Sequence, residues 1–301
     1  MPMLINPAQA GSFLGNQRVG AVYRDQWSQF TLEPFRTAGL YTDLSIDFGL
    51  TDGDWLAFGV QVYGDQSGKL GYQYNTATTS LAYHFAFNGD ETKTLKIGLQ
   101  YGGSQRKLDL TNARFEDELS GITNSSNDRN LFNDFNEISQ DLGIGLSFRT
   151  SNKGGDVIQF GGSVQHLLQA KFAENRIPIR LNVETQALFQ FSNTVWFKPS
   201  VYTSLMAEAK DISILLAFPF RLDKKSPYMF SPGLGYRVGD ALILSLGIDY
   251  KQWSFNVAYD VTVSSARAYN ASRGGFELGL SRIFSHFKKP EVTPVLLCPR
   301  L

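Results

Sequence analysis

The chain has 301 residues, 28 basic and 28 acidic side chains for a formal net charge of +0, and only 19% charged residues. It lacks the basic surface that nucleic-acid binding requires, so we exclude nucleic acid as a partner. A single cysteine excludes an internal disulfide and a cysteine metal site. No stretch approaches the roughly 18 apolar residues of a spanning helix, so a helical membrane protein is excluded as well.

Residues 1–16 come first and show no regular pattern of apolar and polar positions. Pro2 and Pro7 favour an extended backbone. We therefore expect an extended N-terminal segment that precedes the folded domain. The sequence shows no signal peptide, so we expect the numbering to begin after cleavage or within the mature region.

From residue 17 onward, apolar and polar residues alternate. Even positions from Ala38 to Leu50 are mainly apolar, and odd positions from Thr37 to Gly49 are mainly polar or glycine. A period of two is that of a β-strand, and these segments exceed the ~5–6 residues of an average globular strand. A soluble β-sandwich would have shorter strands with Lys and Glu on its outer face. We predict an all-β transmembrane barrel of the outer membrane, with apolar side chains toward lipid and polar ones toward a packed lumen.

The strands can be counted along the chain. We predict antiparallel strands at 17–30, 36–50, 55–64, 71–87, 92–104, 141–150, 157–166, 179–191, 194–206, 211–221, 227–238, 241–250, 253–263 and 273–284. Every second connection is short, and the long ones, 105–140, 167–178 and 264–272, all fall in the other set. Short periplasmic turns and long outer loops are typical of bacterial barrels, so both termini are predicted to be periplasmic. About twelve or sixteen strands remain alternatives, because a missed hairpin also leaves an even number.

Two further segments show no alternation of apolar and polar residues. One is a loop within the barrel domain, 17–284, and the other is the tail that follows that domain. The loop 105–140 is rich in Asp, Glu and Asn, which allows a calcium-binding or partner-docking loop, although no register fits an EF-hand and a solvated loop explains it equally. The periplasmic tail, 285–301, is either a disordered end or a docking peptide. The apolar run Val295, Leu296 and Leu297, followed by Cys298, Pro299 and Arg300, favours docking.

The predicted strands contain few residues that could act in catalysis or bind a metal. His84 and His166 could each act as the base of a surface hydrolase, but Ser80, on the same face as His84, lies about 13 Å away along a strand. We interpret both histidines as wall residues and predict no enzyme activity, no cofactor and no metal. Charges of both signs share the inward face and could form an ion pathway or neutralise one another. They are Asp43, Asp47, Glu184, Asp249, Asp260, Glu277, Arg18, Arg24, Arg149, Arg180, Lys198 and Arg237.

Several short motifs at the start of the chain are distinctive enough to compare with known families. They are Asn6-Pro7-Ala8-Gln9-Ala10-Gly11, then Arg18, then Arg24-Asp25-Gln26-Trp27 and Pro34-Phe35-Arg36-Thr37. Together they resemble the opening of the PorP/SprF family of Bacteroidetes type IX secretion proteins. The glycine-rich run Gly59–Gly71, with Asp65 and Gly68, and the ending Cys298-Pro299-Arg300-Leu301 are also similar to that family.

This resemblance implies a non-enzymatic barrel of the bacterial outer membrane that acts in type IX secretion and gliding motility. Its partners would be outer-membrane lipid and either periplasmic secretion components or a secreted adhesin with a type B C-terminal domain. From the residues alone, a passive, porin-like solute channel remains the alternative.

Overall fold

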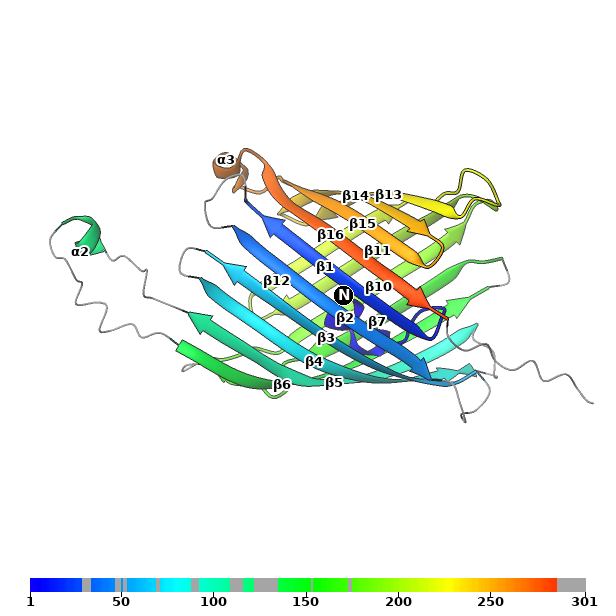
Figure 1. The fold of residues 1–301 in the computed structure, drawn as a ribbon, viewed down its shortest axis with the longest axis horizontal. Coiled ribbons are helices and arrows are strands. Elements are labelled where there is room, and N and C mark those ends of the chain that lie inside the picture. Colours follow the sequence, from blue (N-terminus) through cyan, green and yellow to red (C-terminus); the bar gives the residue numbers. More distant parts are fainter. Residues whose placement is uncertain are drawn as a thin grey trace, which may run out of the picture.

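The computed structural model describes residues 1–28, 34–46, 50, 53–68, 71–87, 92–108, 116–121, 135–152, 154–172 and 175–285. Fourteen strands of this part of the chain close into one barrel, in the spatial order β1-β16-β15-β14-β13-β12-β11-β10-β7-β6-β5-β4-β3-β2 (Figure 1). They are β1 Gln17–Gln26, β2 Phe35–Ile46, β3 Trp55–Ser67, β4 Tyr72–Ala86, β5 Lys93–Leu108, β6 Phe135–Ser151, β7 Val157–Gln165, β10 Arg180–Gln190, β11 Trp196–Met206, β12 Ala209–Ala217, β13 Tyr228–Arg237, β14 Ala241–Tyr250, β15 Trp253–Thr262 and β16 Arg273–Phe284. The predicted fourteen-stranded barrel is confirmed.

The barrel closes where its first and last strands meet. β1 pairs antiparallel with β16, from Gln17 opposite Phe284 to Gln26 opposite Gly275, and pairs with β2 on its other side. Every barrel strand therefore has two neighbours, and no edge exposes unpaired backbone N–H and C=O groups. A bilayer imposes this condition, because hydrocarbon offers no hydrogen-bond partner.

The remaining described elements are short. They are the helices α1 Pro2–Ile5, α2 Glu116–Leu119 and α3 Arg267–Asn270, the 3-10 helix η1 Pro7–Gln9, and the strands β8 Lys171–Phe172 and β9 Asn175–Arg176. The two short strands pair only with each other. None of the helices in the described ranges is long and apolar enough to cross a membrane.

The alternation seen in the sequence separates the outer and inner faces of the wall. On β2, Leu40 is 60% exposed on the outer face, whereas Asp43 is fully buried inside. On β5, Ile97 is 54% exposed and its neighbour Lys96 only 1%. Apolar side chains outside and polar ones inside are the arrangement that lipid favours.

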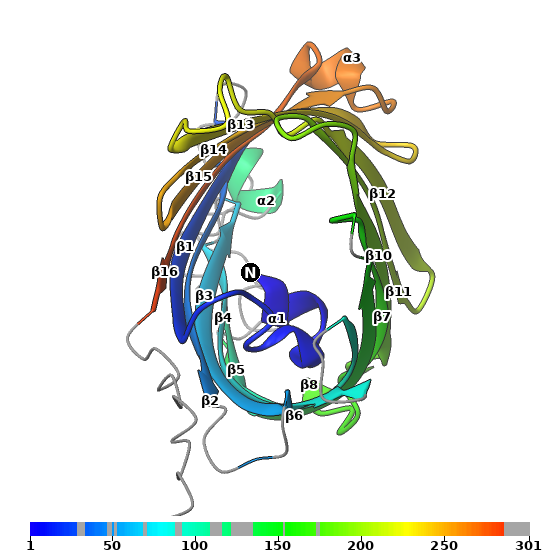
Figure 2. The same ribbon diagram turned by 90° about the vertical axis from the view of Figure 1, so that its right-hand side faces the viewer.

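The two ends of the barrel differ. The terminal end, where β1 begins and β16 ends, carries short turns such as 191–195 and 251–252. The loop end carries α3 and the connection between β5 and β6. The terminal end lies at the right of Figure 1, and Figure 2 looks into the barrel from that side.

Strand boundaries at the loop end differ from those predicted. β5 continues to Leu108 and β6 begins at Phe135, so the long loop is shorter than 105–140. The paired strands continue because alternation does: Ser104 and Ser139 face inward and share a hydrogen bond of 2.9 Å, whereas Ile138 points outward. Most of the acidic loop, 109–115 and 122–134, lies outside the described residues, so calcium binding there stays a hypothesis.

Residues 1–16 lie inside the barrel and include two short helices, at 2–5 and 7–9, so the predicted extended conformation is wrong there. This stretch, called the lumenal segment below, forms α1 and η1, and η1 packs against β4, β5 and β6 (Figure 2). Pro2 and Pro7 lie in the first turns of the two helices. Proline suits those positions because its fixed φ is helical and its missing N–H has no intrahelical partner anyway.

The apolar core is small and lies in the lumen, between this segment and the wall. Its members are Met3, Ala10, Ala57 and Ala82, with Tyr41 packed against them. Polar contacts must therefore supply most of the specificity that holds the lumenal segment in place.

Candidate functional site

Asn6 lies at the centre of the lumenal segment and is fully buried. Its side-chain Oδ1 accepts a hydrogen bond from the Ala8 backbone N–H at 3.0 Å, which caps η1. Its Nδ2 donates to the Leu146 carbonyl at 2.9 Å and to Glu184 Oε1 at 3.1 Å. A carboxamide supplies both the acceptor and the donors that this position requires.

Three inward-facing glycines of neighbouring strands leave room for this motif. A Cβ at Gly98 of β5 would overlap the backbone of Pro7 and Ala8. A Cβ at Gly145 of β6 would overlap Asn6 Oδ1, and one at Gly161 of β7 would lie 2.9 Å from Asn6 Nδ2. The wall is therefore shaped to the Asn-Pro-Ala turn, because any larger residue would displace it.

The end of the motif is fixed by buried polar groups on β2, β3 and β4. Asp43 accepts from the Gly11 N–H at 2.8 Å and pairs with Arg18 through two hydrogen bonds, at 2.9 and 2.7 Å. His84 Nε2 lies 2.7 Å from the Ala10 carbonyl, and Trp55 donates to the Gly11 carbonyl at 3.2 Å. Gly11 has a φ of +66°, a left-handed conformation that suits glycine.

Two charged residues of the wall complete the attachment. The Glu184 carboxylate accepts hydrogen bonds from the side chains of both Asn6 and Gln9. The Lys96 ammonium donates to the Ser12 hydroxyl and, at 3.0 Å, to Gln159 Oε1.

Even the backbone carbonyls of the segment have partners on the wall. The Met3 carbonyl accepts a hydrogen bond from the Gln100 side-chain amide at 3.0 Å, and the Leu4 carbonyl accepts one from the Gln165 side-chain amide at 2.8 Å. Ile5 accepts from Ser163 at 2.5 Å and from the Asn182 amide at 3.2 Å. A segment bound at so many buried points behaves as part of the wall, and it occupies the side of the lumen formed by β2 to β7.

The other side of the lumen is open. A cavity of about 890 Å³ runs along β10 to β16, reaches β1 and β2, and is bounded by Met1 and Pro2 of the lumenal segment. Small side chains line much of it, including Ser200, Ser231, Ser245, Ser254 and Ser281. The lumenal segment therefore narrows the barrel without filling it.

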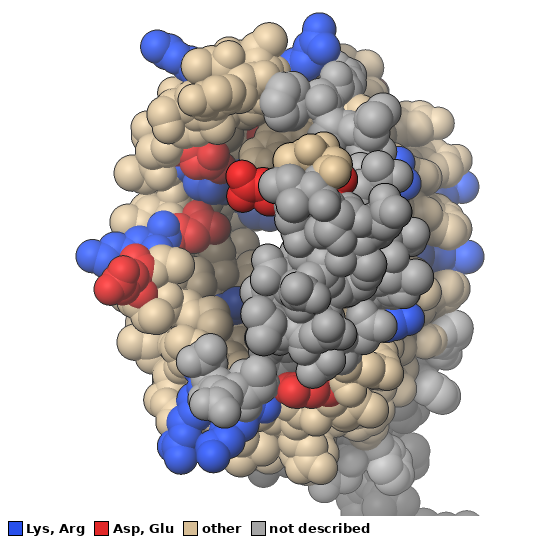
Figure 3. All heavy atoms as spheres, turned by 90° about the vertical axis from the view of Figure 1, so that its left-hand side faces the viewer, with Lys and Arg blue, Asp and Glu red and all other residues tan. Residues whose placement is uncertain are grey.

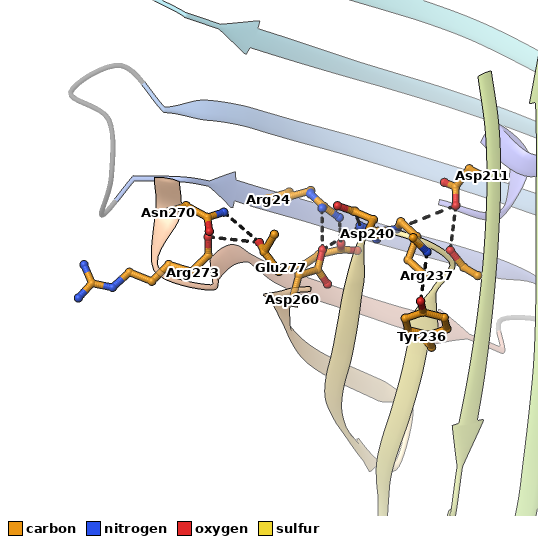
Figure 4. Close-up of polar contacts among 12 residues, drawn as sticks. Arg24, Asp211, Tyr236, Arg237, Asp240, Asp260, Asn270, Arg273 and Glu277 are labelled. Carbon is orange, nitrogen blue, oxygen red and sulfur yellow. Dashed lines mark hydrogen bonds and ion pairs between the residues drawn. The ribbon is translucent and has the colours of Figure 1, made fainter. Parts of the chain in front are cut away.

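A network of ion pairs lies further toward the loop end. Arg24 of β1 contacts Asp260 of β15 at 2.8 Å and Glu277 of β16 at 3.2 Å (Figure 4). Arg237 of β13 contacts the same Asp260 at 3.1 Å and Asp240 at 3.1 Å. Figure 3, viewed from this end, shows acidic and basic side chains around an opening into the barrel. These pairs, with Arg18–Asp43, show that part of the inward charge set neutralises itself; Asp47 lies outside the described residues.

The structure divides the motif residues predicted from the sequence into two places. Asn6, Pro7, Ala8 and Gly11 lie together in the lumen. The others lie at the far end of β1: Arg24 in the ion-pair network, Gln26 opposite Phe35, and Trp27 with its ring edge-on to Phe35 at 5.2 Å. The tail residues Val295, Leu296, Leu297, Cys298, Pro299 and Arg300 lie outside the described residues.

The two histidines have structural partners. His84 holds Ala10 and stacks on Trp55 with ring centroids 4.4 Å apart. Ser80, on the same face, accepts instead from Gln100 at 3.1 Å. His166 Nδ1 lies 2.8 Å from Asp141 Oδ2.

Sequence reasoning missed the glycines, Lys96 and Gln159 as partners of the lumenal segment. Mid-strand glycines at inward positions of adjacent strands, Gly98, Gly145 and Gly161, were the available signal. They mark a wall that another part of the chain approaches closely.

Comparison with known proteins identifies one family. The family model described as type IX secretion system membrane protein PorP/SprF matches residues 1–281. The match includes both the lumenal segment and nearly all of the barrel. No curated relative matches the chain.

Solved structures with the same architecture are outer-membrane barrels. The Ralstonia pickettii toluene transporter TbuX shares 12% identity, with 94% of this chain and 93% of that chain covered and a TM-score of 0.54. A Pseudomonas aeruginosa FadL homologue shares 10%, with 93% and 93% covered and a TM-score of 0.53. The P. putida toluene transporter TodX shares 10%, with 95% and 94% covered and a TM-score of 0.50. At these identities the likeness shows the fold alone.

Proposed function

Because the chain belongs to the PorP/SprF family of type IX secretion system membrane proteins, we propose that this outer-membrane barrel is a non-enzymatic scaffold of that system. One observation carries the proposal: the family's Asn-Pro-Ala motif is used inside the lumen, where Asn6, the Gly11 backbone and Gln9 bind the wall. These residues hold the lumenal segment against the barrel wall, so recognition of a partner would fall to other surfaces of the protein. The scaffold would anchor periplasmic machinery or hold an adhesin with a type B C-terminal domain.

The proposed orientation places the terminal end in the periplasm. Its short turns support this, since bacterial barrels carry short turns on the periplasmic side. The start of β1 and the end of β16 would then face the periplasmic secretion components.

The tail is our proposed docking element for those components. Residues 285–301 follow β16 and contain the apolar run Val295–Leu297 between prolines. Prolines restrict a chain before it binds and so reduce the entropy lost on docking. The apolar side chains would fill pockets on the partner.

Affinity purification from native membranes tests this docking role. Deleting Lys289–Leu301 should leave the folded barrel intact and abolish co-purification of secretion components. Replacing Val295, Leu296 and Leu297 with serine should have the same effect, whereas serine at Lys288, Lys289 and Glu291 of the same tail should not. A truncated protein that keeps its partners and full secretion would show that the tail does not dock.

A passive solute channel is the second candidate, favoured by the open cavity of about 890 Å³ along β10 to β16. Planar-bilayer recordings separate the two functions. A scaffold should give only small or short-lived conductance steps, because the lumenal segment and the ion pairs of Arg24 and Arg237 narrow the lumen. Large and stable open-channel steps would favour the channel.

A further inference from the structure

A second, smaller cavity of about 550 Å³ lies between the lumenal segment and the wall. It is bounded by Gln9, Ser12 and Phe13 on one side and by residues of β5, β6, β7, β10 and β11 on the other. Its lining includes Glu184 and the cations Lys96, Lys198, Arg149 and Arg18, of which Arg18 is already paired with Asp43. Neither lysine forms an ion pair with a carboxylate in the described part of the chain, whereas Arg24 and Arg237 of the loop-end network each do.

Lys96 is the most deeply buried of these cations, at 1% exposure. Among the described residues, its ammonium contacts only neutral acceptors, the Ser12 hydroxyl and Gln159 Oε1, and makes no ion pair with a carboxylate. An ammonium group has three N–H donors, so these two acceptors leave one donor for a ligand. Glu184 lies near enough to favour the Lys96 charge without forming an ion pair with it, whereas Arg149 and Arg18 oppose that charge. Burying a cation among like charges is unfavourable, and an anion in the cavity would relieve that cost.

The nearby carboxylates are already committed to the lumenal segment. Glu184 accepts from Asn6 and Gln9, and Asp43 is held by Arg18 and the Gly11 N–H. Lys198, by contrast, is exposed to the lumen and makes no ion pair within the described part of the chain. Both cavities include Lys198, Arg18 and Gln186 in their walls, so a solute in the larger one could reach the smaller one.

We propose that this cavity binds a multiply charged anion through its carboxylate or phosphate oxygens, with Lys96 and Lys198 as the principal contacts. Its volume lies within the roughly 300–1,000 Å³ typical of small-molecule sites. The bound anion would also link the lumenal segment, through Ser12 and Lys96, to β11.

Isothermal titration of the full chain in a non-ionic detergent tests the proposal, at low ionic strength because salt screens such contacts. Tripolyphosphate and citrate serve as probes for phosphate and carboxylate ligands. Binding of at least one of them supports the site, and the stronger probe identifies the ligand chemistry. If neither probe binds, the proposal is overturned.

Two variants locate the binding. Lys198→Gln should lower the affinity for the better-binding probe at least about tenfold. Lys251→Gln, in a turn at the same end of the barrel, should leave that affinity unchanged. Arg149→Gln provides a second cavity variant, and heat-modifiable gel migration confirms that each variant is folded. If both cavity variants bind the probe as Lys251→Gln does, the anion binds elsewhere and the proposal is wrong.

Discussion

Asn6 illustrates how a single side chain can fix the lumenal segment. It is buried among partners that accept hydrogen bonds, the Leu146 carbonyl and the Glu184 carboxylate, and it also caps η1 through Ala8. Only a group with both donors and an acceptor satisfies this surrounding. Aspartate has nearly the same shape but no donor, which makes it an informative replacement.

We expect Asn6→Asp to weaken docking of the lumenal segment by about 2 kcal/mol or more, roughly thirtyfold, because it leaves buried acceptors unpaired and places a second carboxylate beside Glu184. Maleimide labelling of Ala10→Cys in a Cys298→Ser background measures docking, since Ala10 is fully buried when the segment is bound. Asn193→Asp, in an exposed turn, is the control. Equal labelling rates in the two variants would contradict the role given to Asn6.

Asp156 lies in the turn between β6 and β7, outside the membrane-spanning strands. Its carboxylate accepts hydrogen bonds from the Gln190 N–H and the Asn152 side chain, both at 2.9 Å. These bonds hold the pKa of Asp156 below its ordinary value of 3.8. The stabilisation is therefore fully present above that value and is lost as the pH falls through the lowered pKa.

Asp156→Asn should accordingly lower the thermal unfolding midpoint in detergent at neutral pH, and the difference from the unmodified chain should shrink below about pH 4. Gel-mobility melting curves at several pH values measure it. A difference that stays constant or widens in acid would show that the turn does not depend on the ionised carboxylate.

At the scale of the element, the lumenal segment depends on the shape of the strands that receive it. Gly98 of β5 faces Pro7 and Ala8, and a Cβ there would lie 2.6 Å from Ala8 Cα. Gly103 lies on the same strand, and a Cβ there would meet only the Ser139 carbonyl oxygen at 3.5 Å, an ordinary contact.

Gly98→Ala should therefore release the lumenal segment while the barrel still folds, and Gly103→Ala should change neither. Folding is read from heat-modifiable migration, and release from faster proteolysis of the first sixteen residues. The interpretation fails if the segment remains protected in Gly98→Ala.

At the scale of the whole molecule, the sequence was sufficient to predict the barrel. A period of two is a local pattern, and the strands of the barrel show enough of it to identify their outer faces, as Leu40 and Asp43 do on β2. The short turns then predicted fourteen strands, with twelve or sixteen left open, and the pairing in the barrel settles the number at fourteen.

The lumenal segment was not predictable in the same way. Its conformation depends on contacts with residues far away in the sequence, such as Asn6 with Leu146 and Glu184. Nothing local distinguishes a proline that extends a chain from one that begins a helical turn. The sequence shows the motif, but not that it lies inside the barrel. That position depends on glycines from different strands that come together only in the folded structure.

A scaffold role with the lumenal segment docked is tested most directly by labelling a buried position of the segment in working cells. Ala10 is fully buried, so Ala10→Cys in the Cys298→Ser background should react slowly with maleimide while secretion and gliding proceed at their normal rates. Asn193→Cys in the same background, in an exposed turn, is the control and should be labelled quickly. Rapid labelling of Ala10→Cys only in cells that are secreting would show that the segment leaves the lumen, and would contradict the scaffold.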